Sequence, residues 1–361
     1  MANRAFVLQK LNEVSFETRD KPVLKHSRQV LVHVEQTGIC GSDVHYWKAG
    51  RIGKYVVNGP MVLGHESSGT VVEVGDEVPG LKPGDRVAME PGIPCRYCDL
   101  CKSGLYNHCD NMEFAATPPV DGTLQTYYPI DYDLCYKIPD HMSFEEGAMI
   151  EPVSVAVQIC KRGQVQANDS VLVFGCGPIG LLCQSVAKAY GCRKVIGVDI
   201  SQGRLDFAAK YSCDGVFKPS AKLPEEDSDA YNQRVSKELC DKFNVPNGFD
   251  VILEASGAEP CMQLGVYAAR PQARFVQAGM GRELCNFPVT AALIKELNWT
   301  GSIRYTTGVY PTAVELVSSG QINVKPLVTN RFSFDQAEEA FNLVHSRSEN
   351  VIKVIIEGAK A

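Results

Sequence analysis

The stretch from Ser170 to Gly180, SVLVFGCGPIG, is the part of the sequence that decides the fold. Its first five residues form a continuous apolar run, which is typical of a strand covered on both faces. The glycines fit the spacing G-x-G-x-x-G, and from Pro178 the apolar positions follow a helical repeat that can end at Gly191. Asp199 closes the next apolar run, 24 residues after Gly175. This order predicts a strand–turn–helix unit that binds a dinucleotide.

Each part of this unit has a physical role in holding a dinucleotide. Gly175 makes the turn, Gly177 lets the backbone approach the pyrophosphate, and Gly180 permits close packing of helix on strand. The helix N-terminus supplies free N–H groups for the phosphates. The Asp199 carboxylate would accept hydrogen bonds from the adenosine ribose and repel a 2′-phosphate, which favours NAD over NADP. Arg204 could lie beside the adenine end, and glycines that only pack a helix on a strand are the weaker alternative.

The sequence on either side of this unit has two different patterns. Residues 154–302 alternate strand-like and helical segments, which predicts a doubly wound parallel sheet with right-handed crossovers. Residues 1–153 contain short alternating segments joined by turns with Gly and Pro, which predicts a β-rich domain. The expected strands are 29–35, 68–75 and 85–89 in the first part and 170–174, 195–198, 249–254 and 274–278 in the second. The acidic stretch 219–231 is expected to be a solvated loop or a helix start.

Composition narrows the class of protein. The 361 residues suggest two domains, and 45% hydrophobic residues argue against intrinsic disorder. A net charge of -6 argues against a general nucleic-acid binder. The longest unbroken apolar stretch, 171–183, is shorter than the roughly 20 residues of a membrane-crossing helix. The start of the chain has no signal-peptide core, and 14 cysteines are too few for a disulfide-stapled secreted scaffold, so we expect a cytoplasmic protein without membrane contact.

Four cysteines lie within 15 residues of one another. They follow the spacing C-x2-C-x2-C-x7-C, at Cys95, Cys98, Cys101 and Cys109. Four thiolates complete a tetrahedral zinc site and leave no position for a substrate, so we predict a structural zinc ion over 95–109. Residues 95–110 balance two basic side chains against two acidic ones, which does not fit a zinc-dependent nucleic-acid binder.

A second set of metal-ligand residues is dispersed along the first domain. It offers a thiolate, an imidazole and one or two carboxylates, at Cys40, His65, Glu66 and Glu151. Such a set could hold zinc and still leave a position for water or an alcohol. Spacing alone leaves open that His65 and Glu66 form an ordinary turn with a solvated acid. Asp43 could orient a ligand imidazole or only cap a turn, and the sequence does not separate these two roles.

In their order, these motifs resemble the zinc-containing medium-chain dehydrogenase/reductase family. The matching segments are Gly38–Asp43, Gly64–Glu66, the four-cysteine segment, Glu151-Pro152 and the glycine motif. Further segments are similar to the sorbitol/xylitol dehydrogenase branch, and most of all to its fungal members: Val44–Trp47, Phe114–Pro119, Gln277–Gly281 and Gly301–Tyr305. The resemblance covers essentially the whole chain. It implies a GroES-like catalytic domain over 1–153, a Rossmann domain over 154–302, and a segment 303–361 that returns to complete the catalytic domain.

The resemblance also implies roles for the matching residues. The catalytic zinc would be bound by Cys40, His65 and Glu66, with Glu151 binding the zinc water or entering as water and substrate exchange. Ser42 and His45 correspond to a proton relay. The residues that would line the polyol site are Tyr46, Phe114, Glu151, Arg304 and Tyr305. The residues that would hold NAD, besides the three glycines, are Ile179, Asp199, Arg204, Ala278, Gly279, Met280 and Ile303. Because all four lobe cysteines are present, two zinc ions per subunit are expected.

The activity implied by the resemblance is the reversible oxidation of a sugar alcohol, with hydride transfer to NAD. Xylitol to D-xylulose is the first expectation, and L-arabinitol, sorbitol and galactitol stay open because pocket contacts separate such polyols by only about 1–3 kcal/mol. A threonine or butanediol dehydrogenase is a rival within the family, and a catalytically dispensable NAD-binding structural protein is a more remote one. The family also implies a homo-oligomer, either a dimer or a tetramer.

Two finer expectations concern charge and reactivity. Cys40 and one carboxylate would neutralise Zn²⁺, whereas a second carboxylate would leave the site anionic and weaken it as a Lewis acid. On this ground Glu66 is predicted as the permanent ligand and Glu151 as a residue beyond it. Of the scattered cysteines, Cys176 in the glycine turn is expected to be the one most exposed to oxidation.

Overall fold

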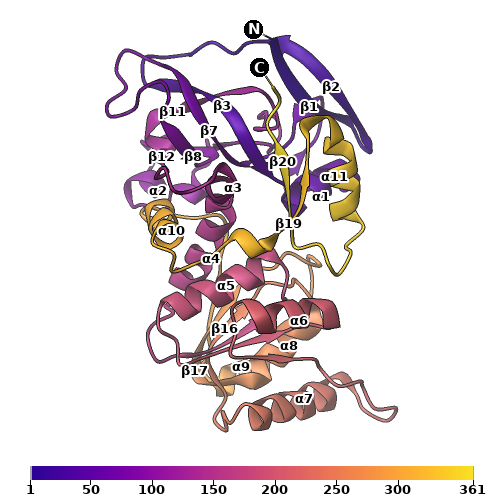
Figure 1. The fold of residues 1–361 in the computed structure, drawn as a ribbon. Helices are drawn as coiled ribbons and strands as arrows, with labels where there is room; N and C mark the ends of the chain where they lie inside the picture. The colour runs from indigo at the N-terminus through magenta and orange to yellow at the C-terminus, as the bar shows by residue number, and fades with distance from the viewer. Residues whose placement is uncertain (1, 361) are drawn as a thin grey trace. The chain divides into compact units, whose positions relative to one another are not determined.

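The computed structural model describes residues 2–360, which form two compact units (Figure 1). One unit comprises Met1–Pro152 together with Thr306–Ala361, and the other comprises Val153–Tyr305. The C-terminal residues therefore fold with the N-terminal ones rather than with the segment that precedes them. Among the described residues, no helix combines the length and the apolar character needed to cross a membrane.

The first unit contains a seven-stranded sheet. Its strands are β12 (Cys135–Lys137), β8 (Arg86–Met89), β7 (Glu66–Val74), β3 (Gln29–Gly38), β20 (Lys353–Glu357) and β19 (Val328–Phe332) in spatial order, with β11 (Tyr127–Asp131) also paired to β3. Three of them, β3, β7 and β8, correspond to the strands expected from alternation at 29–35, 68–75 and 85–89, although β7 ends one residue earlier and β8 begins one residue later than expected. Strands β19 and β20 come from the end of the chain, and β20 pairs antiparallel with β3.

A second, three-stranded sheet of this unit packs with two helices. The sheet consists of β1 (Ala2–Lys10), β2 (Glu13–Asp20) and β6 (Met61–Val62), and the helices are α1 (Gly41–Ala49) and α11 (Ala337–His345). Phe6 and Trp47 both contact Phe341, with ring centroids 5.3 and 6.0 Å apart. Burial of three large aromatic side chains in one cluster fixes α1 on the core, and α1 carries several of the predicted site residues.

The four-cysteine segment forms a small lobe on the first unit. It contains the short helices α2 (Asp99–Lys102) and η1 (Tyr106–His108), and its base is closed by the pairing of β9 (Gly92–Ile93) with β10 (Glu113–Phe114). Of residues 95–109, only Asn107 and Cys109 are buried. The lobe therefore has almost no apolar core of its own.

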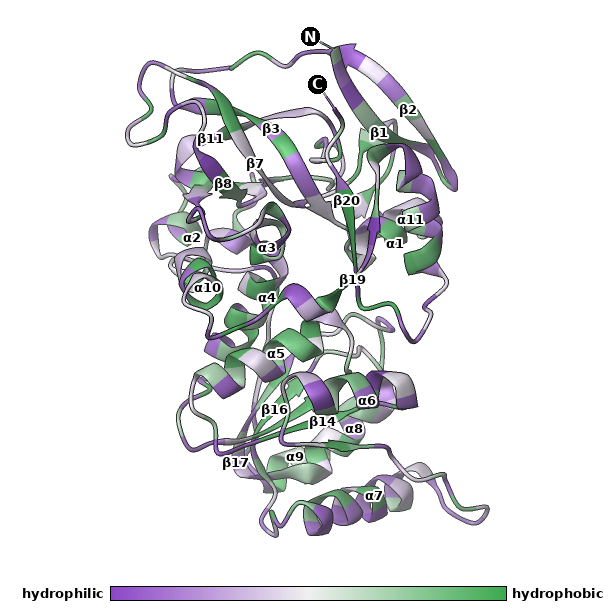
Figure 2. Ribbon diagram, in the orientation of Figure 1, coloured by the Kyte–Doolittle hydropathy of each residue, from purple (hydrophilic) through white to green (hydrophobic). Residues whose placement is uncertain are grey.

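The second unit is a six-stranded parallel sheet, as expected for a Rossmann domain. The spatial order is β15 (Gly215–Phe217), β14 (Lys194–Val198), β13 (Ser170–Phe174), β16 (Phe249–Glu254), β17 (Ala269–Gln277) and β18 (Asn298–Gly301). Every residue of β13 and β16 is buried, and Figure 2 shows β14 and β16 as apolar. Strand β17 begins at Ala269 rather than at 274, because Ala269 already pairs with Phe249 across a register shift.

Helices accompany both faces of this sheet. They are α4 (Ile150–Arg162), α5 (Pro178–Ala189), α6 (Gln202–Tyr211), α7 (Ser228–Lys242), α8 (Glu259–Ala268) and α9 (Val289–Ile294). In Figure 1, α5 and α6 lie on one side of β16 and β17, and α8 and α9 lie on the other. Helix α7 is strongly hydrophilic in Figure 2 and begins inside the acidic stretch 219–231, where the Asp227 carboxylate accepts a hydrogen bond from Ala230 N.

Candidate active site

The glycine turn after β13 has the backbone geometry that a pyrophosphate site requires. Gly175 has a φ of +90°, which favours glycine. A Cβ on Gly180 would overlap with the Gly175 carbonyl oxygen, so helix and turn can approach this closely only without a side chain. A Cβ on Gly177 would meet no atom within 4 Å, and no side chain caps the N-terminus of α5 there. The first N–H groups of α5 therefore have the open surroundings that a dinucleotide phosphate needs.

Asp199 is fixed to this turn through the backbone. Its Oδ2 accepts a hydrogen bond from Cys176 N at 2.8 Å, and its Oδ1 accepts one from Ser201 N at 2.9 Å. Each oxygen keeps a second lone pair, which a ribose hydroxyl could use. The residues present thus fit the adenosine half of a dinucleotide.

The expectation about Cys176 is wrong. Its side chain is fully buried, and burial raises the pKa of its thiol to about 12. Because the thiolate is the form that reacts with oxidants, a buried thiol with a raised pKa is protected rather than exposed. The side chain points into the protein while its backbone N–H holds Asp199.

Within the first unit, Cys40, His65 and Glu66 come together. Their candidate ligand atoms all lie within 4.8 Å of one another, and among the described residues Glu151 does not belong to this group. The sheet register explains the proximity, since Glu66 is the first residue of β7 and lies opposite Gly38, close to Cys40 at the start of α1. A Cβ on Gly38 would overlap with Glu66 Oε2, so the carboxylate needs a glycine at this position.

Asp43 takes the capping role and also lies beside the imidazole of His65. Its Oδ2 accepts a hydrogen bond from Cys40 N at 3.2 Å and its Oδ1 accepts one from Gly64 N at 3.0 Å, so it caps α1 and ties the two ligand segments together. Its Oδ1 also lies 3.3 Å from His65 Nδ1, although without a well-aligned hydrogen bond. With Nδ1 beside a carboxylate, Nε2 is the atom that we expect to face a metal.

Lys353 is a member of this cluster that the sequence analysis did not find. Its side chain is 4% exposed, and its Nζ donates to Glu66 Oε1 at 2.8 Å, to Glu66 Oε2 at 2.6 Å and to the Ile39 carbonyl at 3.2 Å. Burial, the largest single influence, lowers the pKa of Lys353, but the negative charges of Glu66 and Cys40 and the hydrogen bonds to Glu66 together outweigh it, so the pKa is raised. A lysine in the apolar run Val351–Ile356 was the signal available in the sequence.

This lysine corrects the earlier count of charges. That count set Cys40 and one carboxylate against Zn²⁺, and it excluded a second carboxylate as an excess negative charge. Lys353 adds a positive charge beside Glu66 and Asp43 adds a carboxylate beside His65, so a count of charges no longer decides between Glu66 and Glu151. The preference for Glu66 over Glu151 therefore has to be based on the position of Glu66 in the cluster rather than on charge.

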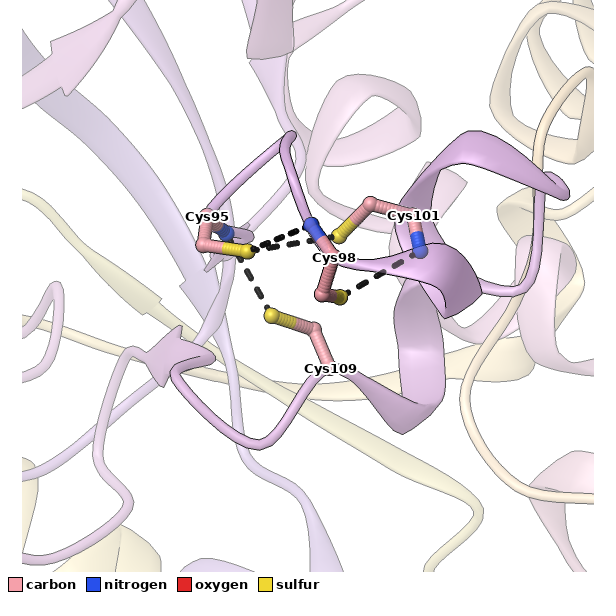
Figure 3. A group of neighbouring side chains, drawn as sticks. All are labelled: Cys95, Cys98, Cys101 and Cys109. Carbon is pink, nitrogen blue, oxygen red and sulfur yellow. Dashed lines mark hydrogen bonds between the residues drawn. The ribbon is translucent and has the colours of Figure 1, made fainter.

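The four lobe cysteines also converge (Figure 3). Their sulfur atoms lie within 4.8 Å of one another, and all four cysteines are free of disulfide bonds. Backbone N–H groups point at the sulfurs, with Cys95 N at 3.3 Å from Cys109 Sγ and Cys98 N at 3.4 Å from Cys95 Sγ. The N–H groups of Tyr97 and Cys98 lower the pKa of Cys95 to about 6, which favours a thiolate. This arrangement fits a tetrahedral zinc ion.

Comparison with known proteins identifies the family. The alcohol dehydrogenase GroES-like domain matches residues 26–140, and the zinc-binding dehydrogenase domain matches residues 178–319. D-xylulose reductase A of Aspergillus oryzae is 50% identical over 356 residues, which cover 99% of this chain and 97% of the relative. A probable D-xylulose reductase A of Aspergillus fumigatus is 52% identical over the same shares. The chain belongs to the zinc-binding dehydrogenase family.

Solved structures place the whole chain in the same fold. L-idonate 5-dehydrogenase from Escherichia coli is 28% identical, with a TM-score of 0.86 over 99% of this chain and 98% of that one. An alcohol dehydrogenase from Escherichia coli CFT073, solved with NADH, is 27% identical, with a TM-score of 0.88 over 99% of both chains. The resemblance to zinc-containing medium-chain dehydrogenases, the GroES-like domain and the Rossmann domain are thereby confirmed.

In this zinc-binding dehydrogenase, α1 also carries the two residues of the predicted relay. Ser42 is half-buried and His45 is exposed. Tyr46, one turn along from Ser42, is buried. Phe114 is buried with its ring centroid 5.7 Å from that of His65, and Glu151 is buried at the start of α4. Phe114 is thus brought to the zinc cluster, and the other roles stay predictions.

The remaining predicted residues lie in the dehydrogenase's second unit, Val153–Tyr305. Arg304 has a left-handed φ of 51°, and Tyr305 is buried. The backbone of 278–280 follows β17, with Ala278 and Gly279 half-buried and Met280 exposed. Ile303 is exposed, and Ile179 and Arg204 are half-buried.

Proposed function

We propose that this protein is a zinc-dependent polyol dehydrogenase that interconverts xylitol and D-xylulose with NAD as the hydride acceptor. The observation that carries the proposal is the cluster of Cys40, His65 and Glu66 in a chain of this family. Two relatives at 50% and 52% identity over nearly the full chain are named for D-xylulose reduction. These names support xylitol ahead of L-arabinitol, sorbitol and galactitol.

The proposed chemistry needs a proton acceptor, a hydride acceptor and an acidified alcohol. A zinc ion held by Cys40, His65 and Glu66 would lower the pKa of a bound hydroxyl, as it does for bound water. Ser42 and His45 on α1 would pass the alcohol proton to solvent, because Ser42 is half-buried and His45 is exposed at the surface. Phe114 beside His65 would exclude water from the metal's surroundings.

We further propose a second, structural zinc ion in the lobe and a preference for NAD over NADP. The converging sulfurs of the four cysteines support the zinc ion, since a segment with almost no apolar core needs another source of stability. The preference for NAD is supported by Asp199, whose carboxylate is held at the end of β14 by two backbone N–H groups. A 2′-phosphate would meet a fixed negative charge there.

A homo-oligomer, a dimer or a tetramer, is also proposed, with a second copy of the chain bound to the edge of the Rossmann sheet. Strand β18 is the last strand of that sheet, so one row of its backbone groups has no neighbouring strand among the described residues. Just before β18 in the chain, Leu293 and Ile294 at the end of α9 are 73% and 76% exposed. An apolar surface beside an open sheet edge suits a self-complementary interface.

The fourteen free cysteines support a reducing compartment, for which we propose the cytoplasm.

The proposal is tested by a panel of pentitols and hexitols assayed for kcat/KM with NAD and with NADP, together with a count of bound metal. We expect xylitol with NAD to give the highest value and two zinc ions per chain. Preference for L-arabinitol, sorbitol or galactitol would correct the substrate alone. Absence of turnover on every polyol, in protein that binds zinc and NADH, would instead favour an NAD-binding structural protein.

A further inference from the structure

Glu254 is a fully buried carboxylate that none of the proposed steps uses. It is the last residue of β16. Its Oε1 accepts hydrogen bonds from Ser256 N at 2.8 Å, from Gly257 N at 3.0 Å and from the Ser256 hydroxyl. Its Oε2 accepts from Gly257 N at 3.0 Å and from Gln277 Nε2 at 2.6 Å. Among the described residues it forms no ion pair, so its two oxygens are held by N–H and O–H donors alone.

The position of Glu254 in the sheet connects three strand ends. It lies opposite Phe174, the last residue of β13, and opposite Gln277, the last residue of β17. The strand order reverses between β13 and β16, and in such sheets ligands bind outside the carboxyl ends of the strands at this point. Glu254 therefore lies below the crevice where the dinucleotide is proposed to bind.

Two loops at this edge interlock through glycines. A Cβ on Gly257 would overlap with the Met280 carbonyl oxygen, and one on Gly279 would overlap with Gly257 N. The Glu254 carbonyl accepts hydrogen bonds from Ala278 N at 2.9 Å and Gly279 N at 2.8 Å. The backbone of 278–280 is thus attached to Glu254 directly through its main chain and indirectly through its side chain.

Gln277 adds an observation that points to a ligand. Its Nε2 donates to Glu254 Oε2 and, at 2.8 Å, to the Gly279 carbonyl, which fixes the orientation of the amide. Its Oε1 is buried and has no hydrogen-bond partner among the described residues. A carboxamide N–H is a donor that could satisfy this oxygen, and nicotinamide carries a carboxamide.

We propose that Glu254 is a positioning residue, which holds the backbone of 278–280 and the Gln277 amide for the nicotinamide half of the dinucleotide. This rests on the proposed use of NAD. Changing Glu254 to Gln keeps the size of the side chain but replaces one acceptor oxygen with an NH₂ group. That group would face Gly257 N or Gln277 Nε2, so two donors would oppose each other and the loop would have to shift.

The test compares binding of NADH, followed by its fluorescence, with binding of ADP-ribose, which lacks nicotinamide, in zinc-loaded protein. For Glu254→Gln we expect the Kd for NADH to rise about tenfold, as for the loss of one or two hydrogen bonds. The Kd for ADP-ribose should change by less than about twofold, since Asp199 and the glycine turn are untouched. The matched control is Asp250→Asn at the opposite end of β16, where Asp250 accepts from Ser170 N at 2.8 Å and pairs with Arg270 at 2.7 Å. It should lower the Tm and leave the ratio of the two Kd values unchanged.

Equal weakening of NADH and ADP-ribose, or a lowered Tm with both Kd values intact, would overturn the proposal, because either result describes a purely structural residue. If Glu254→Gln does not fold, Gln277→Ala decides the matter, since it removes the side-chain link without burying a new donor. That variant should show the same selective loss for NADH, and an unchanged Kd ratio would refute the role. Wild-type protein that binds neither nucleotide would refute the use of NAD instead, and turnover of polyols does not enter the comparison.

Discussion

At the scale of single residues, Lys353 governs the electrostatics of the candidate zinc cluster. It is buried and makes two hydrogen bonds to the Glu66 carboxylate. Such a pair adds little net stability compared with an apolar substitute, but removing one partner leaves an uncompensated buried charge. Its two hydrogen bonds hold the Glu66 carboxylate in place beside Cys40 and His65.

This role predicts a stability loss that depends on the metal. In metal-free protein, Lys353→Met should destabilise the first unit by about 3–5 kcal/mol, because Glu66 is left buried and unpaired. In zinc-loaded protein the loss should be smaller, since the metal replaces the missing positive charge. The measurement is the Tm of both forms, with Lys137→Met, which removes the exposed lysine of an ion pair with Asp85, as the control. Equal losses in the two forms would show that Glu66 does not face the metal.

The buried carboxyl group of Glu90 should make the free energy of unfolding depend on pH. It accepts hydrogen bonds from Tyr136 at 2.9 Å and from Tyr106, yet burial outweighs them and raises its pKa from 4.5 to about 7. The folded protein therefore keeps this proton up to about pH 7, whereas the unfolded chain releases it near 4.5. Stability from this group is fully present below pH 4.5 and is lost as the pH rises through 7.

The corresponding variant is Glu90→Gln. Relative to wild type it should gain up to about 3 kcal/mol between pH 5 and pH 8, because the amide cannot ionise. Thermal unfolding at several pH values measures this gain, and Glu73→Gln on exposed sheet surface should show no such trend. A difference between Glu90→Gln and wild type that is constant across this range would contradict the account.

At the scale of elements, the four-cysteine lobe is expected to depend on a bound metal ion for its local stability. Because only two residues of 95–109 are buried, zinc is expected to supply the stability that a core would give. Cys98→Ser should lower the metal content from two ions to one per chain and make the lobe sensitive to protease. Cys240→Ser on α7 is the control. Unchanged metal content in Cys98→Ser would show that the lobe holds no zinc.

The strands and the glycine unit could be predicted from sequence because their signals are local. The run 170–174, the glycine spacing and Pro178 each specify the conformation of their own segment, and the structure has β13 and α5 at these positions. Lys353 and Glu254 could not be assigned roles, since their partners are set by register between distant strands. Glu66 lies opposite Gly38 and Gly38 opposite Ile355, so Lys353 reaches Glu66 only after three strands have paired.

At the scale of the whole molecule, the exposed apolar surface near β18 predicts self-association. Replacing Leu293 with Glu on α9 should shift the protein to a smaller assembly, because a charge at an apolar interface opposes burial. Sedimentation velocity measures the change. Leu223→Glu, at a position that is 55% exposed in the loop before α7, is the matched control. If both variants keep the wild-type assembly, the interface lies elsewhere.

The chain as a whole combines two sites whose chemistry depends on each other. The Rossmann unit offers a dinucleotide site with a fixed Asp199, and the GroES-like unit offers a metal cluster built on β7 and α1. Neither site alone can oxidise an alcohol, since a hydride needs an acceptor and a hydroxyl needs acidification. The account therefore rests on a metal ion at Cys40, His65 and Glu66.

The most direct test is xylitol oxidation by Cys40→Ala protein that still binds NADH and keeps its lobe zinc. Loss of a metal worth several kcal/mol in the transition state predicts that kcat/KM falls by roughly a thousandfold or more, with an unchanged Kd for NADH. Turnover that stays within about tenfold of wild type, in protein shown to carry only the lobe zinc, would contradict the central claim.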